Sequence, residues 1–170
     1  MTLLRKKICM LGAFAVGKTS LVARYIREHS TGNLDKYLTT VGVKVSNKDL
    51  MVGDQALRFM IWDMAGADEF QDVHLPHMIG ASGYLLIADG TRRETVETAR
   101  RLQKRVIDEI GNLPFIFVVN KIDLLDDWEI EQRELAEFSG QGWSVLQSSA
   151  KTGANVEESF ALLAEKILEK

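Results

Sequence analysis

The stretch GAFAVGKT at residues 12–19 decides the fold of this chain. It fits the pattern G-x-x-x-x-G-K-[ST], in which glycines let backbone N–H groups turn inward around an anionic phosphate group. An apolar run, residues 6–11, precedes it, and an amphipathic stretch, residues 18–29, follows it. Strand, glycine loop and helix in this order predict a phosphate-binding loop at the positive end of a helix.

Outward from this loop, strand-length apolar runs alternate with helix-length amphipathic stretches, which predicts an α/β fold with helices on both faces of a mainly parallel sheet. The dipeptide Gly53-Asp54 is a turn signal that makes the second and third strands an antiparallel hairpin. The expected strands are residues 6–11, 43–52, 57–63, 83–89, 114–120 and 144–148. The expected helices are residues 18–29, 91–110, 128–139 and 156–168.

Length and composition narrow the class of protein further. The chain has 170 residues, is 46% hydrophobic and carries a net charge of −3, which predicts one globular domain over residues 1–170. An acidic balance disfavours binding to a nucleic-acid backbone. The lone Cys9 cannot form an intrachain disulfide and is expected in the core. No apolar run approaches the ~18–20 residues of a membrane span, and we expect a cytoplasmic monomer.

A second motif, NKID at residues 120–123, follows an apolar run at the carboxyl end of an expected strand, where open α/β sheets bind ligands. A carboxylate such as that of Asp123 accepts two hydrogen bonds from the ring N–H and exocyclic amine of guanine, whereas adenine offers no such pair. The motif therefore predicts GTP rather than ATP. The stem of Lys121 is expected along the base, and Asn120 is expected to tie this loop to the phosphate loop.

Three shorter signals follow the same order along the chain. The segment Ser149–Lys151 ends another expected strand and can offer the Ala150 N–H to the guanine carbonyl oxygen. Asp63 and Gly66 form a D-x-x-G pattern, with the carboxylate directed to the water shell of Mg²⁺ and the glycine N–H to the γ-phosphate. Thr40 supplies a hydroxyl for Mg²⁺ in the triphosphate state. Taken singly, the first signal is equally typical of an ordinary strand-to-helix turn, whereas a D-x-x-G pattern is more typical of a turn and Thr40 more typical of a polar loop.

Together these motifs resemble the Ras-like small GTPases, a family of P-loop GTPases. Within that family, YLTTVG at residues 37–42 and the pair Trp62-Asp63 resemble the Rab and Rho branches. The resemblance implies a six-stranded sheet, five helices, switch segments near residues 36–43 and 63–78, and a cycle between GTP and GDP with Mg²⁺. It implies nucleotide binding by Gly12, Ala15, Val16, Gly17, Lys18, Thr19, Ser20, Asn120, Lys121, Asp123, Ser149, Ala150 and Lys151. It implies metal binding by Thr19, Thr40 and Asp63, and a catalytic site at Lys18, Thr40, Gly66 and Ala67.

Three features depart from the family pattern. The aromatic residue that commonly stacks on the guanine before the first switch has no clear counterpart, and Asn33 or Leu34 aligns best with it. Ala67 stands where a glutamine usually orients the attacking water, which predicts slow intrinsic hydrolysis. Asp68 and Glu69 are the nearest substitutes for that role; the alternative is a solvated helix start. Phe14 stands where most relatives have a small residue, so its ring is expected to crowd the γ-phosphate or exclude an arginine supplied by another protein.

Three functions are compatible with these residues. The first is a switch that hydrolyses GTP slowly and signals to effector, activating and exchange proteins through the two switch segments. The second is a GTP-bound docking module with negligible hydrolysis, and the third, disfavoured by Asp123, is an ATP phosphotransferase. Residues 168–170 contain no cysteine box, so any membrane contact is expected through partners or a further tail. His74 and His77 have a metal-binding spacing, but we favour a partner surface.

Overall fold

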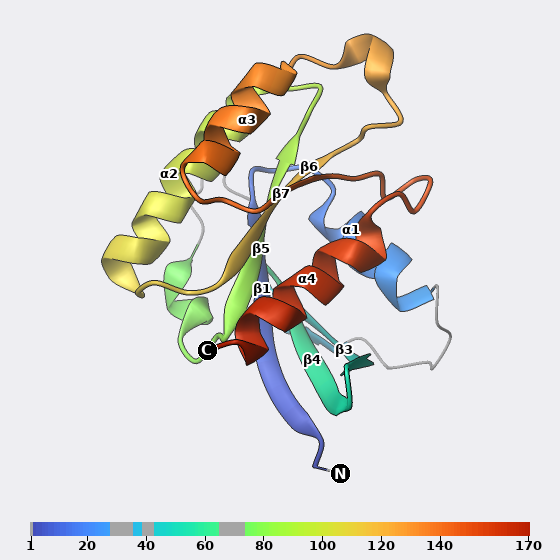
Figure 1. Cartoon of the computed structure of the whole chain (residues 1–170), viewed down its shortest axis with the longest axis vertical. Coiled ribbons are helices and arrows are strands. Elements are labelled where there is room, and N and C mark those ends of the chain that lie inside the picture. The colour runs from blue at the N-terminus through green and yellow to red at the C-terminus, as the bar shows by residue number, and fades with distance from the viewer. Residues whose placement is uncertain (1, 28–35, 39–42, 65–73) are drawn as a thin grey trace.

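The structure is a computed structural model that describes residues 2–27, 36–38, 43–64 and 74–170. Its strands form one sheet in the order β2-β3-β4-β1-β5-β6-β7, with helices on both faces (Figure 1). The strands are β1 (Leu4–Gly12), β2 (Lys36–Leu38), β3 (Val43–Val52), β4 (Gln55–Met64), β5 (Gly83–Asp89), β6 (Phe115–Asn120) and β7 (Val145–Gln147). The α-helices are α1 (Lys18–Arg27), α2 (Arg93–Glu109), α3 (Gln132–Gly140) and α4 (Val156–Leu168), and Leu75–Met78 and Leu125–Asp127 are 3₁₀ turns.

The topology confirms the predicted fold class. All six expected strands are present, and β3 runs antiparallel to both of its neighbours while β4, β1, β5, β6 and β7 pair in parallel. A seventh strand, β2, adds three residues at one edge. The sequence pattern missed it because three residues are too few to show an alternation. The described residues contain four of the five helices that the family resemblance implied.

Alternation along the central strands gives the sheet two buried faces. In β1, Ile8 and Met10 face the cluster that packs against α1 and α4, whereas Cys9 and Leu11 face the cluster that packs against α2 and α3. Cys9 is fully buried, as predicted, and burial raises the pKa of its thiol to about 12. In α2, the apolar residues Val96, Ala99, Leu102 and Val106 recur at steps of three or four and are buried, and Ile110 is partly buried against the same cluster.

Two helices begin later than the sequence predicted. Helix α2 begins at Arg93 rather than at residue 91, because Thr91 hydrogen-bonds the Asp89 carboxylate and Arg92 has an extended backbone. Helix α3 begins at Gln132 rather than at residue 128, because a 3₁₀ turn ends just before the extended Trp128.

Parallel pairing brings the functional motifs to one end of the sheet, at the carboxyl ends of its parallel strands. The phosphate loop follows β1. The strands that run parallel to β1 end on the same side as it does; they are β4, β5, β6 and β7. The hairpin between β3 and β4 turns at Gly53, whose φ of +57° is one that glycine adopts without strain. Because β4 begins after this turn and runs parallel to β1, the turn lies at the opposite end of the sheet, away from the motifs.

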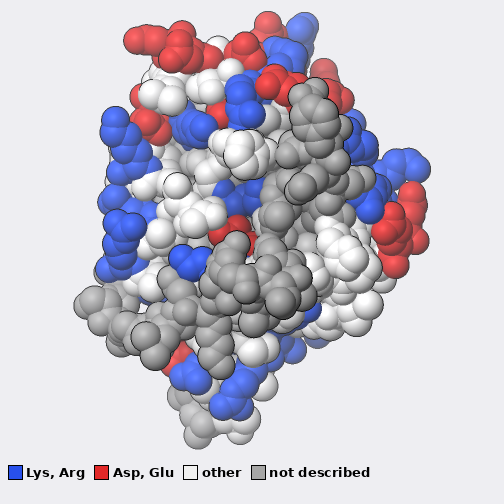
Figure 2. Space-filling view, turned by 180° about the vertical axis from the view of Figure 1, so that it is seen from behind, with Lys and Arg blue, Asp and Glu red and all other residues white. Residues whose placement is uncertain are grey.

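The outer surface is charged. On the face shown in Figure 2, Lys and Arg side chains follow one flank and acidic side chains gather mainly at the upper end. Across the described residues, no helix is long and apolar enough to cross a lipid bilayer.

Candidate functional site

The phosphate loop, residues 12–17, has all of its backbone carbonyls engaged. Lys18 Nζ donates to Gly12 O at 3.3 Å and to Ala13 O at 3.0 Å. Two further cations donate to the next two carbonyls, Arg92 Nη2 to Phe14 O at 2.8 Å and Lys121 Nζ to Ala15 O at 3.1 Å. The last two carbonyls accept from neutral groups, Val16 O from Asn120 Nδ2 at 3.0 Å and Gly17 O from the Leu21 N–H at 2.9 Å. Three of these donors are cationic, so positive charge offsets the negative ends of the peptide dipoles. The loop is therefore a favourable place for an anion.

The backbone of this loop adopts a shape that most side chains resist. Ala15 has a φ of +60° and Gly17 a φ of +105°. A Cβ atom at Gly17 would lie 2.3 Å from Asn120 Nδ2, so the second glycine of the motif is needed for the close approach of the NKID loop. The motif therefore fixes both the curvature of the loop and its contact with β6.

Lys18 begins helix α1 and is buried beneath the loop, with 7% of its surface exposed. Burial lowers the pKa of its ammonium group to about 8, although the nearby Asp63 carboxylate opposes the shift and the Arg92 guanidinium adds to it. A buried ammonium group is poorly solvated, so an anionic ligand would stabilise its charged form, because a phosphate would replace the solvation that burial removes.

Thr19 and Asp63 bring two oxygen atoms together next to Lys18. The Thr19 hydroxyl donates to Asp63 Oδ2 at 2.5 Å, and Asp63 lies at the carboxyl end of β4. Burial raises the pKa of the Asp63 carboxyl, although the Thr19 hydrogen bond, Lys18 and Lys44 oppose the shift. A hydroxyl and a carboxylate are hard oxygen ligands of the kind that Mg²⁺ prefers, so the pair fits that ion.

The base loops are joined by hydrogen bonds between side chains. Asn120 is buried, and its Oδ1 accepts from Ser148 Oγ at 3.1 Å and from the Ala150 N–H at 3.2 Å. Ser149 Oγ donates to Asp123 Oδ1 at 2.6 Å. The structure thus brings the NKID loop and the loop after β7 together, and the Ala150 N–H, which the sequence analysis expected to face the guanine carbonyl oxygen, donates to Asn120 Oδ1.

A cavity of about 570 Å³ joins the phosphate loop to the base loops. Four basic residues line it together with Gly17, Thr19, Ser20, Ala23, Asn120 and Ala150, and none of the described residues that line it is acidic. The basic residues are Arg24, Arg27, Lys121 and Lys151. A cavity of this size and charge suits an anionic ligand of nucleotide dimensions.

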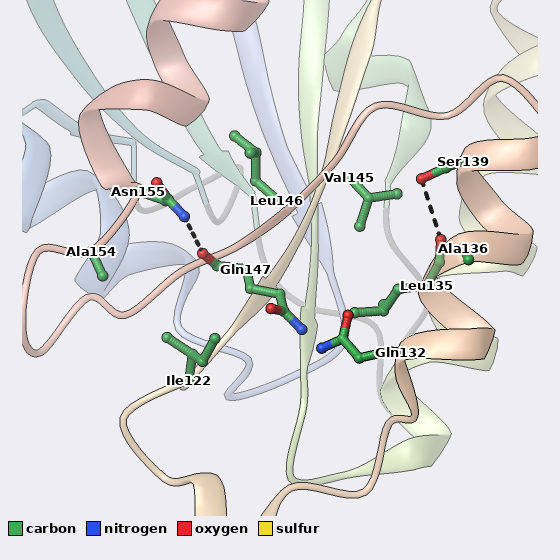
Figure 3. A pocket seen from close by; sticks show the side chains of 10 residues that line it. All are labelled: Ile122, Gln132, Leu135, Ala136, Ser139, Val145, Leu146, Gln147, Ala154 and Asn155. Atoms are coloured by element: carbon green, nitrogen blue, oxygen red, sulfur yellow. Dashed lines mark hydrogen bonds between the residues drawn. The ribbon is translucent and has the colours of Figure 1, made fainter.

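A second cavity, of about 390 Å³, lies between α3, the edge strand β7 and the residues before α4 (Figure 3). None of the described residues that line it has an ionisable side chain. One of its amides is already engaged, since Asn155 Nδ2 donates to Gln147 O at 2.8 Å. It is less suited to chemistry on a charged ligand than the first cavity.

His74 and His77 lie side by side, with ring centroids 4.4 Å apart. Burial, His74 and Lys7 together lower the pKa of His77. Within the described part of the chain, no group of three His, Cys, Asp or Glu side chains is arranged to hold a metal ion. The histidine pair is therefore not supported as a metal site.

Sequence analysis missed two residues at the site, Asp89 and Arg92. Asp89 ends β5 and is 1% exposed, and its carboxylate contacts both Arg92 and Lys121. The signal was available for Asp89, because a polar residue at the carboxyl end of a buried parallel strand is the feature that singled out Asp63 and Asn120. For Arg92 there was none, since an arginine before a charged helix is typical of a solvated surface.

Several predicted residues cannot be compared with the structure. Thr40, Gly66 and Ala67 lie outside the described residues, as do Asp68 and Glu69. The predicted roles of these residues in metal binding, in contact with the γ-phosphate and in orienting water stay predictions.

Comparison with known proteins gives one consistent result. The model of the Ras family matches residues 7–169. Ras-related protein Rab-31 from Rattus norvegicus is 29% identical over 164 residues, which cover 95% of this chain and 82% of that protein. Rab-17 from Mus musculus is 32% identical over 96% of this chain and 76% of its own length. RABA4a from Arabidopsis thaliana is 32% identical over 95% of this chain and 71% of its own length.

Proposed function

Because the chain belongs to the Ras family of GTP-binding switch proteins, on its Rab-like side, we propose that it binds GTP and GDP with Mg²⁺ and hydrolyses GTP slowly. The observation that carries this proposal is the cavity that joins the phosphate loop to the base loops, lined by four basic residues together with Gly17, Thr19 and Asn120. The family resemblance and the cavity support the same ligand independently.

The phosphate end of the nucleotide is assigned to the loop and the start of α1. Gly12, Ala15, Val16 and Gly17 supply backbone groups, and Lys18 supplies the charge that holds the β- and γ-phosphates. Ser20 lines the same cavity. The burial of Lys18 supports this assignment because a phosphate would compensate its lost solvation.

The base is assigned to the loops after β6 and β7. Asp123 accepts hydrogen bonds from guanine, and its partner Ser149 fixes the orientation of the carboxylate. The aliphatic stem of Lys121 lies along the base, while Asn120 links this loop to Val16. Ala150 and Lys151 line the same cavity and complete the base side.

Mg²⁺ is assigned to Thr19 and Asp63, whose oxygens lie together beside Lys18, with Thr40 as a further ligand in the triphosphate state. A bound Mg²⁺ supplies positive charge that stabilises the phosphate oxygens. The chain itself contributes Lys18 to the same end of the nucleotide. Thr19 holds its hydroxyl in place by hydrogen bonding the Asp63 carboxylate.

The reaction is attack of water in line on the γ-phosphorus. A new P–O bond forms to the water oxygen, the bond to the β–γ bridging oxygen breaks, and the products are GDP and phosphate. No covalent intermediate with the protein is expected. Ala67 has no hydrogen-bonding group with which to orient the water, which is why we propose a slow intrinsic rate.

A standing GTP-bound docking module is the second candidate. Phe14 supports it, since this residue of the phosphate loop is 64% exposed and its ring provides an apolar surface for a partner next to the nucleotide. In both cases we propose that effector, exchange and activating proteins contact residues 36–43 and 63–78. Any membrane association would then depend on these partners or on further chain.

Single-turnover hydrolysis distinguishes the two candidates. The purified chain is loaded with GTP and Mg²⁺, and its bound nucleotide is followed by chromatography over hours without partner proteins. Conversion to GDP is expected for a slow switch. Persistent GTP that also resists a panel of activating proteins would support the docking module. If Asp68→Ala and Glu69→Ala both convert GTP at the parent rate, neither residue replaces the missing glutamine.

A further inference from the structure

The carbonyl of Phe14 is held by a residue outside the recognised motifs. Among the six carbonyls of the phosphate loop, the other five accept from Lys18, Asn120, Lys121 or the next turn of α1. Among the described residues, only Arg92 donates to the Phe14 carbonyl, from 78 positions further along the chain. Resting on the proposed function, we infer that Arg92 is a positioning residue that holds the phosphate loop in its nucleotide-binding shape.

Asp89 anchors this arginine. Its Oδ2 accepts from Arg92 Nε at 3.0 Å and from Lys121 Nζ at 2.8 Å. Its Oδ1 accepts from the N–H and the hydroxyl of Thr91, at 2.9 and 2.7 Å. Because the carboxylate is fixed on both oxygens, it aligns two cations whose other contacts are the neighbouring carbonyls of Phe14 and Ala15.

The charge state of Asp89 suits this role. Burial alone would raise the pKa of its carboxyl, but the hydrogen bonds from Lys121, Thr91 and Arg92 together outweigh burial and hold the pKa below its usual value. The carboxylate is thus ionised across the physiological pH range, and both cations remain paired with it.

The backbone of Arg92 is also fixed. It is extended, with φ −138° and ψ +100°, immediately before α2 begins. Its N–H donates to Asp89 O at 3.0 Å, and its carbonyl accepts from the Thr95 hydroxyl at 2.7 Å. The guanidinium therefore starts from a defined position, and its planar fork can bond Asp89 and Phe14 at the same time.

The effect of Arg92 should be concentrated at the phosphate end of the nucleotide. Phe14 directly follows the two carbonyls that Lys18 contacts, and Lys18 is the residue proposed to hold the terminal phosphates. A loosened Phe14 peptide would disturb this part of the loop without touching the Asp123 and Ser149 pair. The triphosphate complex should therefore suffer more than the diphosphate complex.

Arg93 is a matched control within the same turn. It is the same residue type in the next position, but its guanidinium pairs with Glu134 at 2.6 Å and with the Glu129 carbonyl. Those contacts join α2 to α3 and its preceding loop. Replacing Arg93 removes a guanidinium without removing a donor to the phosphate loop.

The test measures release of mant-GDP and of a fluorescent non-hydrolysable GTP analogue from the full chain with Mg²⁺. Arg92→Ala should release mant-GDP roughly tenfold faster than the parent, with a larger acceleration for the triphosphate analogue, because a charge-assisted hydrogen bond is lost. Arg92→Lys keeps the charge but not the planar guanidinium, so its release rates should lie between those of the parent and those of Arg92→Ala. Arg93→Ala should release both nucleotides at the parent rate.

Two results would overturn the inference. The first is parent-like release from Arg92→Ala; if GTP hydrolysis is lost at the same time, Arg92 would act on the reacting phosphate instead. The second is equal acceleration of both nucleotides in Arg92→Ala and Arg93→Ala, which would indicate general destabilisation. If the parent chain itself does not bind mant-GDP, the proposed function fails first and the inference fails with it.

Discussion

The phosphate end and the base end of the cavity are organised differently. At the phosphate end, side chains from α1, β6 and the residues before α2 hold backbone carbonyls of a single loop. At the base end, two neighbouring loops are joined by side-chain pairs, Ser148 with Asn120 and Ser149 with Asp123. Backbone groups and cations attract any phosphate, whereas one oriented carboxylate distinguishes one base from another. We therefore expect affinity to come mainly from the first end and specificity from the second.

Replacing Lys18 should have the largest effect. Lys18→Ala removes a buried cation from the phosphate end, so affinity for both GDP and GTP should fall roughly 100- to 1000-fold, while the preference for guanine over adenine is retained. Fluorescence titration with mant-nucleotides measures both quantities. Lys151→Ala, which removes a cavity lysine at the base end, is the matched control and should bind far more tightly than Lys18→Ala.

Replacing Asp123 should separate specificity from affinity. Asp123→Asn gives an amide whose N–H can donate to the 2-carbonyl of xanthine, so affinity for GTP should fall roughly 30- to 100-fold while affinity for XTP rises. Competition between the two nucleotides measures the change. Asp126→Asn, three residues away in a 3₁₀ turn, should keep the parent preference. An unchanged preference in Asp123→Asn would show that the base is read elsewhere.

Replacing Gly17 should disturb the connection between the two ends. In Gly17→Ala the new Cβ would clash with Asn120 Nδ2, and the φ of +105° at residue 17 would strain an alanine. Release of mant-GDP should therefore accelerate roughly tenfold. Stopped-flow fluorescence measures release. Gly53→Ala is the control, because the φ of +57° at this position would strain an alanine while no atom of the described residues lies within 4 Å of the added Cβ. It should lower the melting temperature and leave release unchanged; accelerated release there would attribute the Gly17 effect to strain alone.

Replacing Ser149 should have the smallest effect. Ser149→Ala removes the hydroxyl that orients the Asp123 carboxylate, so GTP affinity should fall only about threefold, in line with one ordinary hydrogen bond. Isothermal titration calorimetry resolves such a difference. Ser139→Ala removes a longer bond of 3.4 Å to a helix carbonyl at the second cavity and serves as the control. Equal losses in both variants would argue against a specific role for Ser149.

Most of the fold could be predicted because its signals are local. Residues 43–52, 83–89 and 156–168 have the predicted boundaries, since each is a long apolar or amphipathic run between turn residues. The start of α2 could not be predicted, because it depends on the contacts of Thr91 and Arg92 with Asp89 rather than on helix propensity.

The candidate site was predictable to the same extent. Phosphate and base motifs are contiguous in sequence, so their letters carry the chemistry and parallel pairing brings them together. The link from Arg92 to Phe14 spans 78 positions and joins a backbone carbonyl to an unremarkable arginine. No local pattern encodes such a contact; it follows from the packing of β5 between β1 and β6.

The most direct test of the division between the two ends is competition for mant-GDP bound to the parent chain. GTP, ATP and GMP are titrated as competitors in the presence of Mg²⁺. The account predicts displacement by GTP, and displacement by ATP and by GMP only at concentrations at least roughly 100-fold higher, because each lacks one of the two recognised groups. Displacement by ATP as readily as by GTP would contradict recognition of guanine by Asp123. Displacement by GMP as readily as by GTP would contradict the phosphate loop as the main source of affinity.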